Sequence, residues 1–181
     1  MRGWFFVLTG CMFSGKTEEL QRLLKRHRIA HRVFQLFKPD IDDRYEKDKV
    51  TTHDNISLDA AVVPTSDPMV ILSLIGDDTK VVGIDEAQFF SPAIVEVCET
   101  LLQRGIDVIV AGLKQDADDK PFGSMAALLT IADGADYLRA ICDICGEEAT
   151  KTRYVGDKSN KTGQIKIGGT KDYIAVCNEH C

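Results

Sequence analysis

Two consecutive stretches decide the fold of this 181-residue chain: Trp4-Phe5-Phe6-Val7-Leu8-Thr9, and then Gly10-Cys11-Met12-Phe13-Ser14-Gly15-Lys16-Thr17. An uninterrupted apolar run is typical of a strand that is buried on both faces of a parallel sheet. The second stretch fits G-x-x-x-x-G-K-[ST], in which backbone N–H groups surround phosphate oxygens at the start of a helix. Strand, loop and helix in this order predict an α/β domain that binds a nucleoside triphosphate.

The loop from Gly10 to Thr17 supplies the candidate ATP-binding residues. Lys16 is expected to reach the β- and γ-phosphates, and the Thr17 hydroxyl is expected to bind Mg²⁺. The structural alternative is a glycine-rich turn that holds no ligand. Because the motif lies between a predicted strand and a predicted helix, the phosphate-binding interpretation is favoured.

Strands and helices alternate over the first 140 residues. This order predicts an α/β fold with a mostly parallel P-loop sheet, of the RecA-like type, flanked by helices. Beyond it the chain is polar and rich in cysteine, so we predict two domains: a nucleotide-binding domain at 1–140 and a small zinc-binding domain at 141–181. Strands are expected at 4–9, 32–37, 80–85, 107–112, 135–141, 164–167 and 173–176, and helices at 16–30, 91–104 and 122–133.

Two carboxylates end the predicted strand at 80–85, where Val81-Val82-Gly83-Ile84 leads into Asp85-Glu86. In sheets of this class, an aspartate at a strand end near the phosphate loop organises the metal. Asp85 is therefore expected to hold Mg²⁺, and Glu86 to take a proton from an acceptor hydroxyl. The alternative is an acidic pair that only caps a helix.

Charge and hydropathy argue against nucleic-acid and membrane partners. The net charge is -6 and the sequence pI is about 5.2, which argues against a dedicated nucleic-acid binder. The basic run at 25–32 is interpreted as a solvated helix face. No apolar run reaches 18 residues, so no membrane span is expected, and the N-terminal apolar stretch is too short for a signal peptide. We therefore expect a cytoplasmic protein with a small-molecule substrate.

Four of the six cysteines lie in the last forty residues. This clustering in an intracellular chain indicates a metal site rather than a disulfide framework. Two pairs with the spacing of zinc ligands supply a candidate tetrahedral site: Cys142 with Cys145, and Cys177 with His180. Cys181 competes with His180 as the fourth ligand, and free buried thiols are the alternative to a metal site.

Taken together and in order, these motifs resemble one family, the type II thymidine kinases, over nearly the whole chain. The similarity includes the phosphate loop continued by Glu18-Glu19-Leu20, the strand end Ile84-Asp85-Glu86-Ala87-Gln88-Phe89-Phe90, and Pro121-Phe122-Gly123. Further matches are Lys38-Pro39, Asp42-Asp43-Arg44-Tyr45, Thr52-His53-Asp54, Ile167-Gly168-Gly169 and Tyr173.

The resemblance implies transfer of the ATP γ-phosphate to the 5′-hydroxyl of thymidine or deoxyuridine, with Mg²⁺. It implies that Glu86 is the general base, that Arg44 stabilises the charge on the transferring group together with Lys16, and that Asp42 lies near the phosphates and the metal. Gln88 is implied to lie close to the phosphates and the acceptor.

For the acceptor, the resemblance implies aromatic walls and a loop that closes over the base, the lasso, at about 152–173. Members of the family are usually homotetramers in which structural zinc anchors this loop. The implied substrate-binding residues are Phe89, Leu113, Phe122, Thr152, Ile165, Lys166, Ile167, Gly168 and Tyr173.

The chain departs from the family pattern beside the expected base. Lys114 follows Leu113 where an aspartate is usual, Ala117 stands where an aromatic residue is usual, and Lys166 replaces an apolar residue. Cys11 replaces a frequent proline. These differences leave open a kinase of another nucleoside, a P-loop ATPase or regulatory module, or a binding protein with the same fold.

Overall fold

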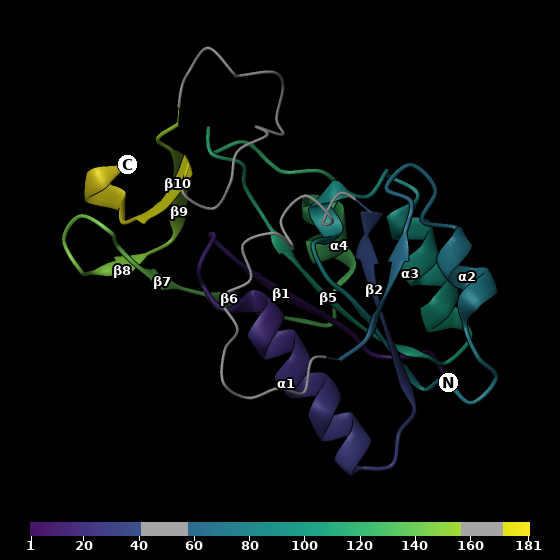
Figure 1. The fold of residues 1–181 in the computed structure, drawn as a ribbon. Coiled ribbons are helices and arrows are strands. Elements are labelled where there is room, and N and C mark those ends of the chain that lie inside the picture. The colour runs from purple at the N-terminus through teal and green to yellow at the C-terminus, as the bar shows by residue number, and fades with distance from the viewer. Residues whose placement is uncertain (41–57, 157–171) are drawn as a thin grey trace.

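The computed structural model describes residues 1–40, 58–156 and 172–181. Within these residues one sheet has six strands in the order β3-β2-β4-β5-β1-β6, and every pair of neighbours is parallel. The prediction of an α/β fold with a parallel sheet is confirmed (Figure 1). The strands are β1 Phe5–Gly10, β2 Phe34–Pro39, β3 Ala60–Val63, β4 Val81–Ile84, β5 Asp107–Leu113 and β6 Gly134–Leu138.

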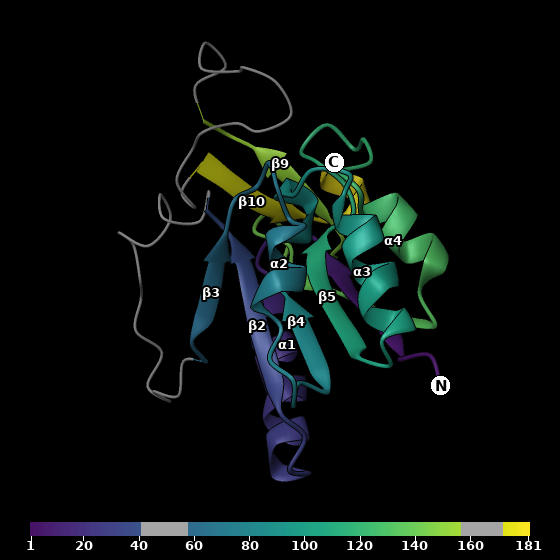
Figure 2. The same ribbon diagram turned by 90° about the vertical axis from the view of Figure 1, so that its right-hand side faces the viewer.

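Helices cover both faces of this sheet. Figure 2 shows α2, α3 and α4 in front of the strands and α1 behind them. The strands alternate accordingly: Val82 and Ile84 pack with α3, whereas Val81 packs with Leu20 and Leu24 of α1. The helices are α1 Lys16–Ile29, α2 Val70–Leu74, α3 Ile94–Gln103 and α4 Met125–Ile131.

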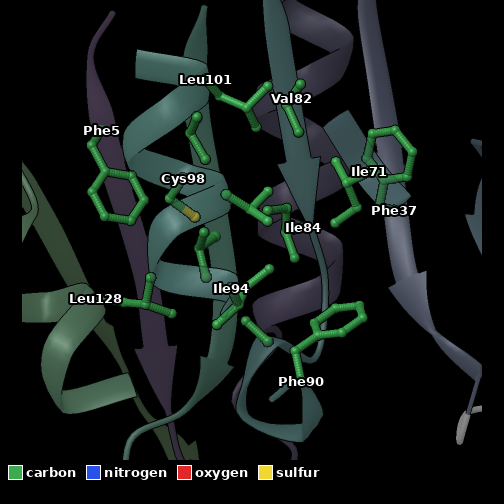
Figure 3. Close-up of a cluster of buried hydrophobic side chains, with 14 of the residues drawn as sticks. Phe5, Phe37, Ile71, Val82, Ile84, Phe90, Ile94, Cys98, Leu101 and Leu128 are labelled. Carbon is green, nitrogen blue, oxygen red and sulfur yellow. The ribbon is translucent and has the colours of Figure 1, made fainter. Parts of the chain in front are cut away.

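The larger core cluster lies between the sheet and α2, α3 and α4 (Figure 3). Phe5, Ile94, Cys98, Leu101 and Leu128 are fully buried there. Burial of a large apolar side chain contributes about 1.5–3 kcal/mol, so this layer is a major source of the stability that holds the strand ends in place. Among the described residues, no helix has the length and apolar character needed to cross a bilayer.

The chain after β6 forms two small antiparallel sheets, β7 with β8 and β9 with β10. A single strand at 135–141 was expected, and this is wrong. The last register pair of β6 is Leu138 with Gly10, where β1 ends, so the chain beyond has no parallel partner and pairs with β8 instead. The small strands are β7 Ala140–Ile141, β8 Glu148–Ala149, β9 Lys151–Tyr154 and β10 Tyr173–Val176. The strand expected at 164–167 lies outside the described residues.

Candidate active site

The phosphate loop joins β1 to α1 at the carboxyl end of the sheet. Gly15, with φ 78°, has a left-handed conformation immediately before the helix, which glycine adopts without steric cost. Lys16 is buried, and its Nζ donates a hydrogen bond to the Cys11 carbonyl oxygen at 2.7 Å. Burial lowers the pKa of Lys16, against the opposing effect of the Glu86 and Asp85 carboxylates. The lysine is thus held on the phosphate loop, facing two acids.

The carboxyl end of β4 meets the start of α1, as the sequence predicted. Thr17 Oγ1 donates a hydrogen bond to Asp85 Oδ2 at 2.9 Å, although the two residues lie 68 positions apart. The other oxygen of Asp85, Oδ1, accepts the Glu86 N–H at 3.0 Å. A hydroxyl and a carboxylate oxygen at this distance are hard oxygen donors of the kind that Mg²⁺ prefers.

Glu86 has an unusual backbone. Its φ of 50° and ψ of 41° lie in the left-handed region, which a residue other than glycine enters at a cost of about 1–2 kcal/mol. This conformation begins the short 3₁₀ helix η3 at Ala87–Phe89. Strained backbone of this kind persists where the surroundings fix it, and it is common at functional sites.

Gln88 holds the Glu86 carboxylate from the side. The Gln88 side chain is buried; its Nε2 donates to Glu86 Oε2 at 2.5 Å, and its Oε1 accepts the Leu113 N–H at 3.0 Å. The amide therefore links the acid after β4 to the end of β5. The family resemblance implied that Gln88 lies near the acceptor, but it did not indicate this bridge.

The segment after β5 packs against η3. A Cβ on Gly123, which has φ 50°, would lie 2.1 Å from the Gln88 carbonyl oxygen, so only glycine fits. The Phe122 ring meets the Phe89 ring edge to face, with centroids 5.5 Å apart and planes at 83°. The two aromatic rings implied as walls of the base pocket therefore lie together, beside the Glu86–Gln88 pair.

The strand β9 touches the phosphate loop. The Met12 N–H donates to Thr152 Oγ1 at 2.9 Å, and just before β9 the carbonyl oxygen of Ala149 in β8 accepts a hydrogen bond from Cys11 Sγ at 3.4 Å. At the other end of β9, the Tyr154 ring lies 5.2 Å from the ring of Tyr173 on β10. Thr152 and Tyr173, both implied as substrate residues, thus belong to one small sheet that contacts the phosphate loop.

A turn between β5 and α4 reaches the same strand, and sequence reasoning missed this contact. Asp119 accepts hydrogen bonds from Lys151 Nζ at 3.0 Å and from Arg153 Nη2 at 2.7 Å. The Arg153 contact, aided by Lys151, lowers the pKa of Asp119 to about 2. The signal in the sequence was the alternation Lys151-Thr152-Arg153, which places two cations on one side of a strand.

Two of the residues that depart from the family pattern, Lys114 and Ala117, lie on or beside this turn. Lys114 extends its Nζ over the Tyr137 ring, 5.6 Å from the centroid. The carbonyl oxygen of Ala117 accepts a hydrogen bond from Arg153 Nη1 at 3.3 Å. The Ala117 segment is therefore fixed to β9 by its backbone.

Three cysteines and one histidine converge near the C-terminus. The ligand atoms of Cys142, Cys145, Cys177 and His180 all lie within 4.8 Å of one another. The Cys145 and Cys177 sulfurs are 3.8 Å apart, and tetrahedral zinc with bonds of about 2.3 Å to sulfur places two thiolates ~3.8 Å apart. The cluster is thus compatible with zinc.

The fourth member of this cluster is His180 and not Cys181. His180 Nδ1 lies 3.2 Å from Cys177 Sγ and 3.9 Å from Cys142 Sγ. Cys181 Sγ faces away, toward Arg153 and Asp119. The geometry favours the set of three cysteines and one histidine over the alternative with Cys181.

Six of the predicted site residues lie outside the described residues. They are Asp42, Arg44, Ile165, Lys166, Ile167 and Gly168.

Fold and site together define a P-loop protein whose phosphate loop faces an acidic strand end. A family model described as thymidine kinase matches residues 3–181. Thymidine kinases of Coprothermobacter proteolyticus and Bdellovibrio bacteriovorus are 46% and 42% identical to the chain. These matches cover 98% and 99% of the chain, and 90% and 85% of the two relatives. The chain belongs to the thymidine kinase family.

Proposed function

We propose that this protein transfers the γ-phosphoryl group of ATP to the 5′-hydroxyl of thymidine or deoxyuridine, with Glu86 as general base. The observation that carries the proposal is the Thr17–Asp85 contact directly beside the Glu86–Gln88 pair. It brings the donor loop and a carboxylate base to one edge of the sheet. The family supports ATP as the donor.

The chemistry needs alignment and charge neutralisation more than covalent participation by the protein. Glu86 accepts the proton of the 5′-hydroxyl while that oxygen bonds to the γ-phosphorus. The bond from the γ-phosphorus to the bridging oxygen breaks, and ADP leaves with its electron pair. Lys16 neutralises charge on the phosphates, and we propose that Arg44 does the same from outside the described residues.

Thr17 and Asp85 would hold Mg²⁺, with Asp42 and Gln88 close by. The oxygen donors of the first two residues fit the ion. When bound, the ion would supply positive charge that offsets the negative charge of the phosphates. Thr17 and Asp85 are already hydrogen-bonded to each other, so both side chains are directed to the same point.

The base of the nucleoside is proposed to lie against Phe89 and Phe122, with Leu113 behind them. Their edge-to-face packing supplies a rigid apolar wall. Thr152 and Tyr173 are proposed to contribute from the small sheet of β9 and β10, and Ile165, Lys166, Ile167 and Gly168 from the segment between these strands. Kinase action on other nucleosides and a pure ATPase are not favoured, since the family match spans residues 3–181.

Residues 141–181 are proposed to form a zinc domain in which Cys142, Cys145, Cys177 and His180 hold one structural ion. Four protein ligands leave no open position, so zinc would stabilise the fold rather than take part in transfer. We further propose a cytoplasmic homotetramer that acts in nucleotide salvage, without nucleic-acid or membrane partners. Light scattering coupled to gel filtration tests the oligomeric state, and a dimer or monomer would contradict it.

The activity is tested with radiolabelled ATP and a panel of nucleosides. Thymidine and deoxyuridine are expected to yield 5′-monophosphates, whereas lack of product with every nucleoside would exclude the proposal. Glu86→Gln is expected to lower kcat by roughly 10²–10⁴ while ATP binding stays, because a general base contributes on that order. Glu96→Gln, on the exposed side of α3, is the matched control and should keep the wild-type rate.

A further inference from the structure

Asp119 is held in an unusual conformation on the turn between β5 and α4. Its φ of 61° lies in the left-handed region, where residues other than glycine are uncommon. Its carboxylate accepts hydrogen bonds from Lys151 at 3.0 Å and Arg153 at 2.7 Å, and the Cys181 thiol lies 3.5 Å from Oδ2. Both cations and the acid are mostly shielded from solvent, with side chains 23% to 32% exposed. Partial burial makes such a paired arrangement stronger than an exposed ion pair.

The turn that carries Asp119 is held in shape by its own hydrogen bonds. The buried Asp116 accepts the N–H groups of Asp118 and Lys120 with Oδ1, both at 2.9 Å. The Asp116 N–H also donates to the Lys120 carbonyl oxygen at 2.9 Å. These bonds close the turn on itself, so the position of the Asp119 carboxylate follows the position of the turn.

Both ends of the turn are attached to Gln88. Before the turn, the Leu113 N–H donates to Gln88 Oε1 at 3.0 Å. After it, the backbone at Gly123 packs against the Gln88 carbonyl group. The turn therefore moves with the residue that holds the proposed base Glu86.

The strand β9 is held on two sides. Lys151 and Arg153 point to one side and bind Asp119, whereas Thr152 between them points to the other side and accepts the Met12 N–H. Asp119 thus fixes β9 relative to Gln88 and the proposed general base Glu86, while Met12 fixes β9 relative to the phosphate loop. These two attachments together determine the position of β9, and with it the position of Thr152.

We infer that Asp119 is a positioning residue for the acceptor nucleoside, which acts by docking β9 through Lys151 and Arg153. The inference rests on the proposed function, because Thr152 of β9 is proposed there as a substrate residue. The proposed function gives Asp119 no contact with ATP or with the reacting atoms. Its loss should therefore affect nucleoside binding more than the rate at saturation.

Two variants separate docking from folding. Asp119→Gly removes the carboxylate and suits the φ of 61°, and Asp119→Asn keeps the shape while removing the charge. Both are expected to raise KM for thymidine about tenfold, with kcat and KM for ATP within about twofold of wild type. Asp78→Asn, in an exposed turn far from β9, is the matched control and should change none of these values.

A second measurement does not depend on activity. Amide hydrogen exchange in β9 should become at least about tenfold faster in Asp119→Gly, while exchange in β1 and β5 stays unchanged. A thymidine KM within twofold of wild type in both variants, or unchanged exchange in β9, would overturn the inference. If the wild-type protein phosphorylates no nucleoside, the proposed function fails, and the positioning role fails with it. The hydrogen-exchange result then tests only whether Asp119 holds β9 in place.

Discussion

Gln88 has a tightly constrained side chain in the candidate active site. Both ends of its amide are used, one by the Glu86 carboxylate and the other by the Leu113 N–H. The residue is buried, so no water replaces a lost partner readily. Its role is thus to fix the direction of Glu86, whose backbone is already strained.

We predict that Gln88→Leu will impair both stability and turnover. The variant leaves the Leu113 N–H without its acceptor, at a cost of about 1–3 kcal/mol, and removes the amide that donates to Glu86. The melting temperature should fall by several degrees, and kcat should fall by about tenfold or more. Gln103→Leu at the exposed end of α3 is the control and should leave kcat unchanged. A normal kcat in Gln88→Leu would show that Glu86 is oriented by other contacts.

Cys98 provides a test of the core that is independent of the active site. Burial, with a smaller effect of Glu99, raises the pKa of the Cys98 thiol to about 12. In the unfolded chain a cysteine ionises near pH 8.5. The folded form therefore binds the proton more tightly, and the stability from this group is complete below about pH 8.5 and is lost as the pH rises toward 12.

Cys98→Ala should accordingly flatten the alkaline part of the stability curve. Between about pH 9 and 11 the wild-type protein should lose up to ~1.4 kcal/mol per pH unit more than the variant. Urea unfolding at several pH values measures the difference, and other titrating groups cancel in the comparison. Parallel curves for the two proteins would contradict a shifted thiol.

At the scale of the elements, the connection between β5 and α4 links η3 to β9, the two elements beside the proposed nucleoside site. Gly123 lies where this connection packs on η3, and its φ of 50° and the nearby Gln88 carbonyl exclude a side chain. A residue there would displace the turn, η3 or both. The position thus demands glycine for two physical reasons at once.

Gly123→Ala is expected to destabilise the protein by at least about 2 kcal/mol, because backbone strain and a steric clash add. Gly105→Ala isolates the strain: its φ is 78° and its nearest neighbour is the Met1 carbonyl oxygen at 3.2 Å, so about 1 kcal/mol is expected. Chemical unfolding measures both values. An equal loss of unfolding free energy in the two variants would mean that the backbone at Gln88 moves aside at no energetic cost.

Apolar runs made three of the predicted strands clear in the sequence. β1, β4 and β5 are buried on both faces, so nearly every residue in them is apolar. β3 and α2 were missed because they are short and partly exposed, which leaves no periodic pattern. In the site, the motifs predicted separately that Thr17 and Asp85 bind Mg²⁺, and the structure adds the hydrogen bond between them. The attachments of Gln88 and Asp119 depend on contacts between distant segments, which no local pattern reports.

At the scale of the whole molecule, a parallel sheet and a small cysteine-rich unit meet around the phosphate loop. Cys11 of the loop packs in the same apolar cluster as Cys142, Ala149, Ala175 and Cys177. The predicted zinc site therefore lies directly behind a wall of the nucleotide site. Loss of the metal should disturb the unit that carries Thr152 before it disturbs the sheet.

Metal analysis of two serine variants tests this arrangement. Cys177→Ser removes a member of the cluster and should reduce zinc well below the expected one ion per chain, with lower melting temperature. Cys181→Ser removes the adjacent thiol, which faces Arg153 and Asp119, and should keep the metal. Equal zinc content in both variants would contradict the assignment of His180 as the fourth ligand.

The two ends of the described chain differ in what an experimenter can attach to them. Met1 is fully exposed, and the Gly3 N–H is bound to the Leu102 carbonyl oxygen at the edge of the sheet away from the phosphate loop. Cys181 lies beside Asp119 and Arg153, next to His180 of the candidate zinc cluster. Figure 1 shows this end of the chain far from the N-terminus. An affinity tag or surface-immobilisation handle at the first end leaves the site accessible. A C-terminal handle would crowd β9 and imitate a defect in nucleoside binding, so purification and biosensor work should use the N-terminus.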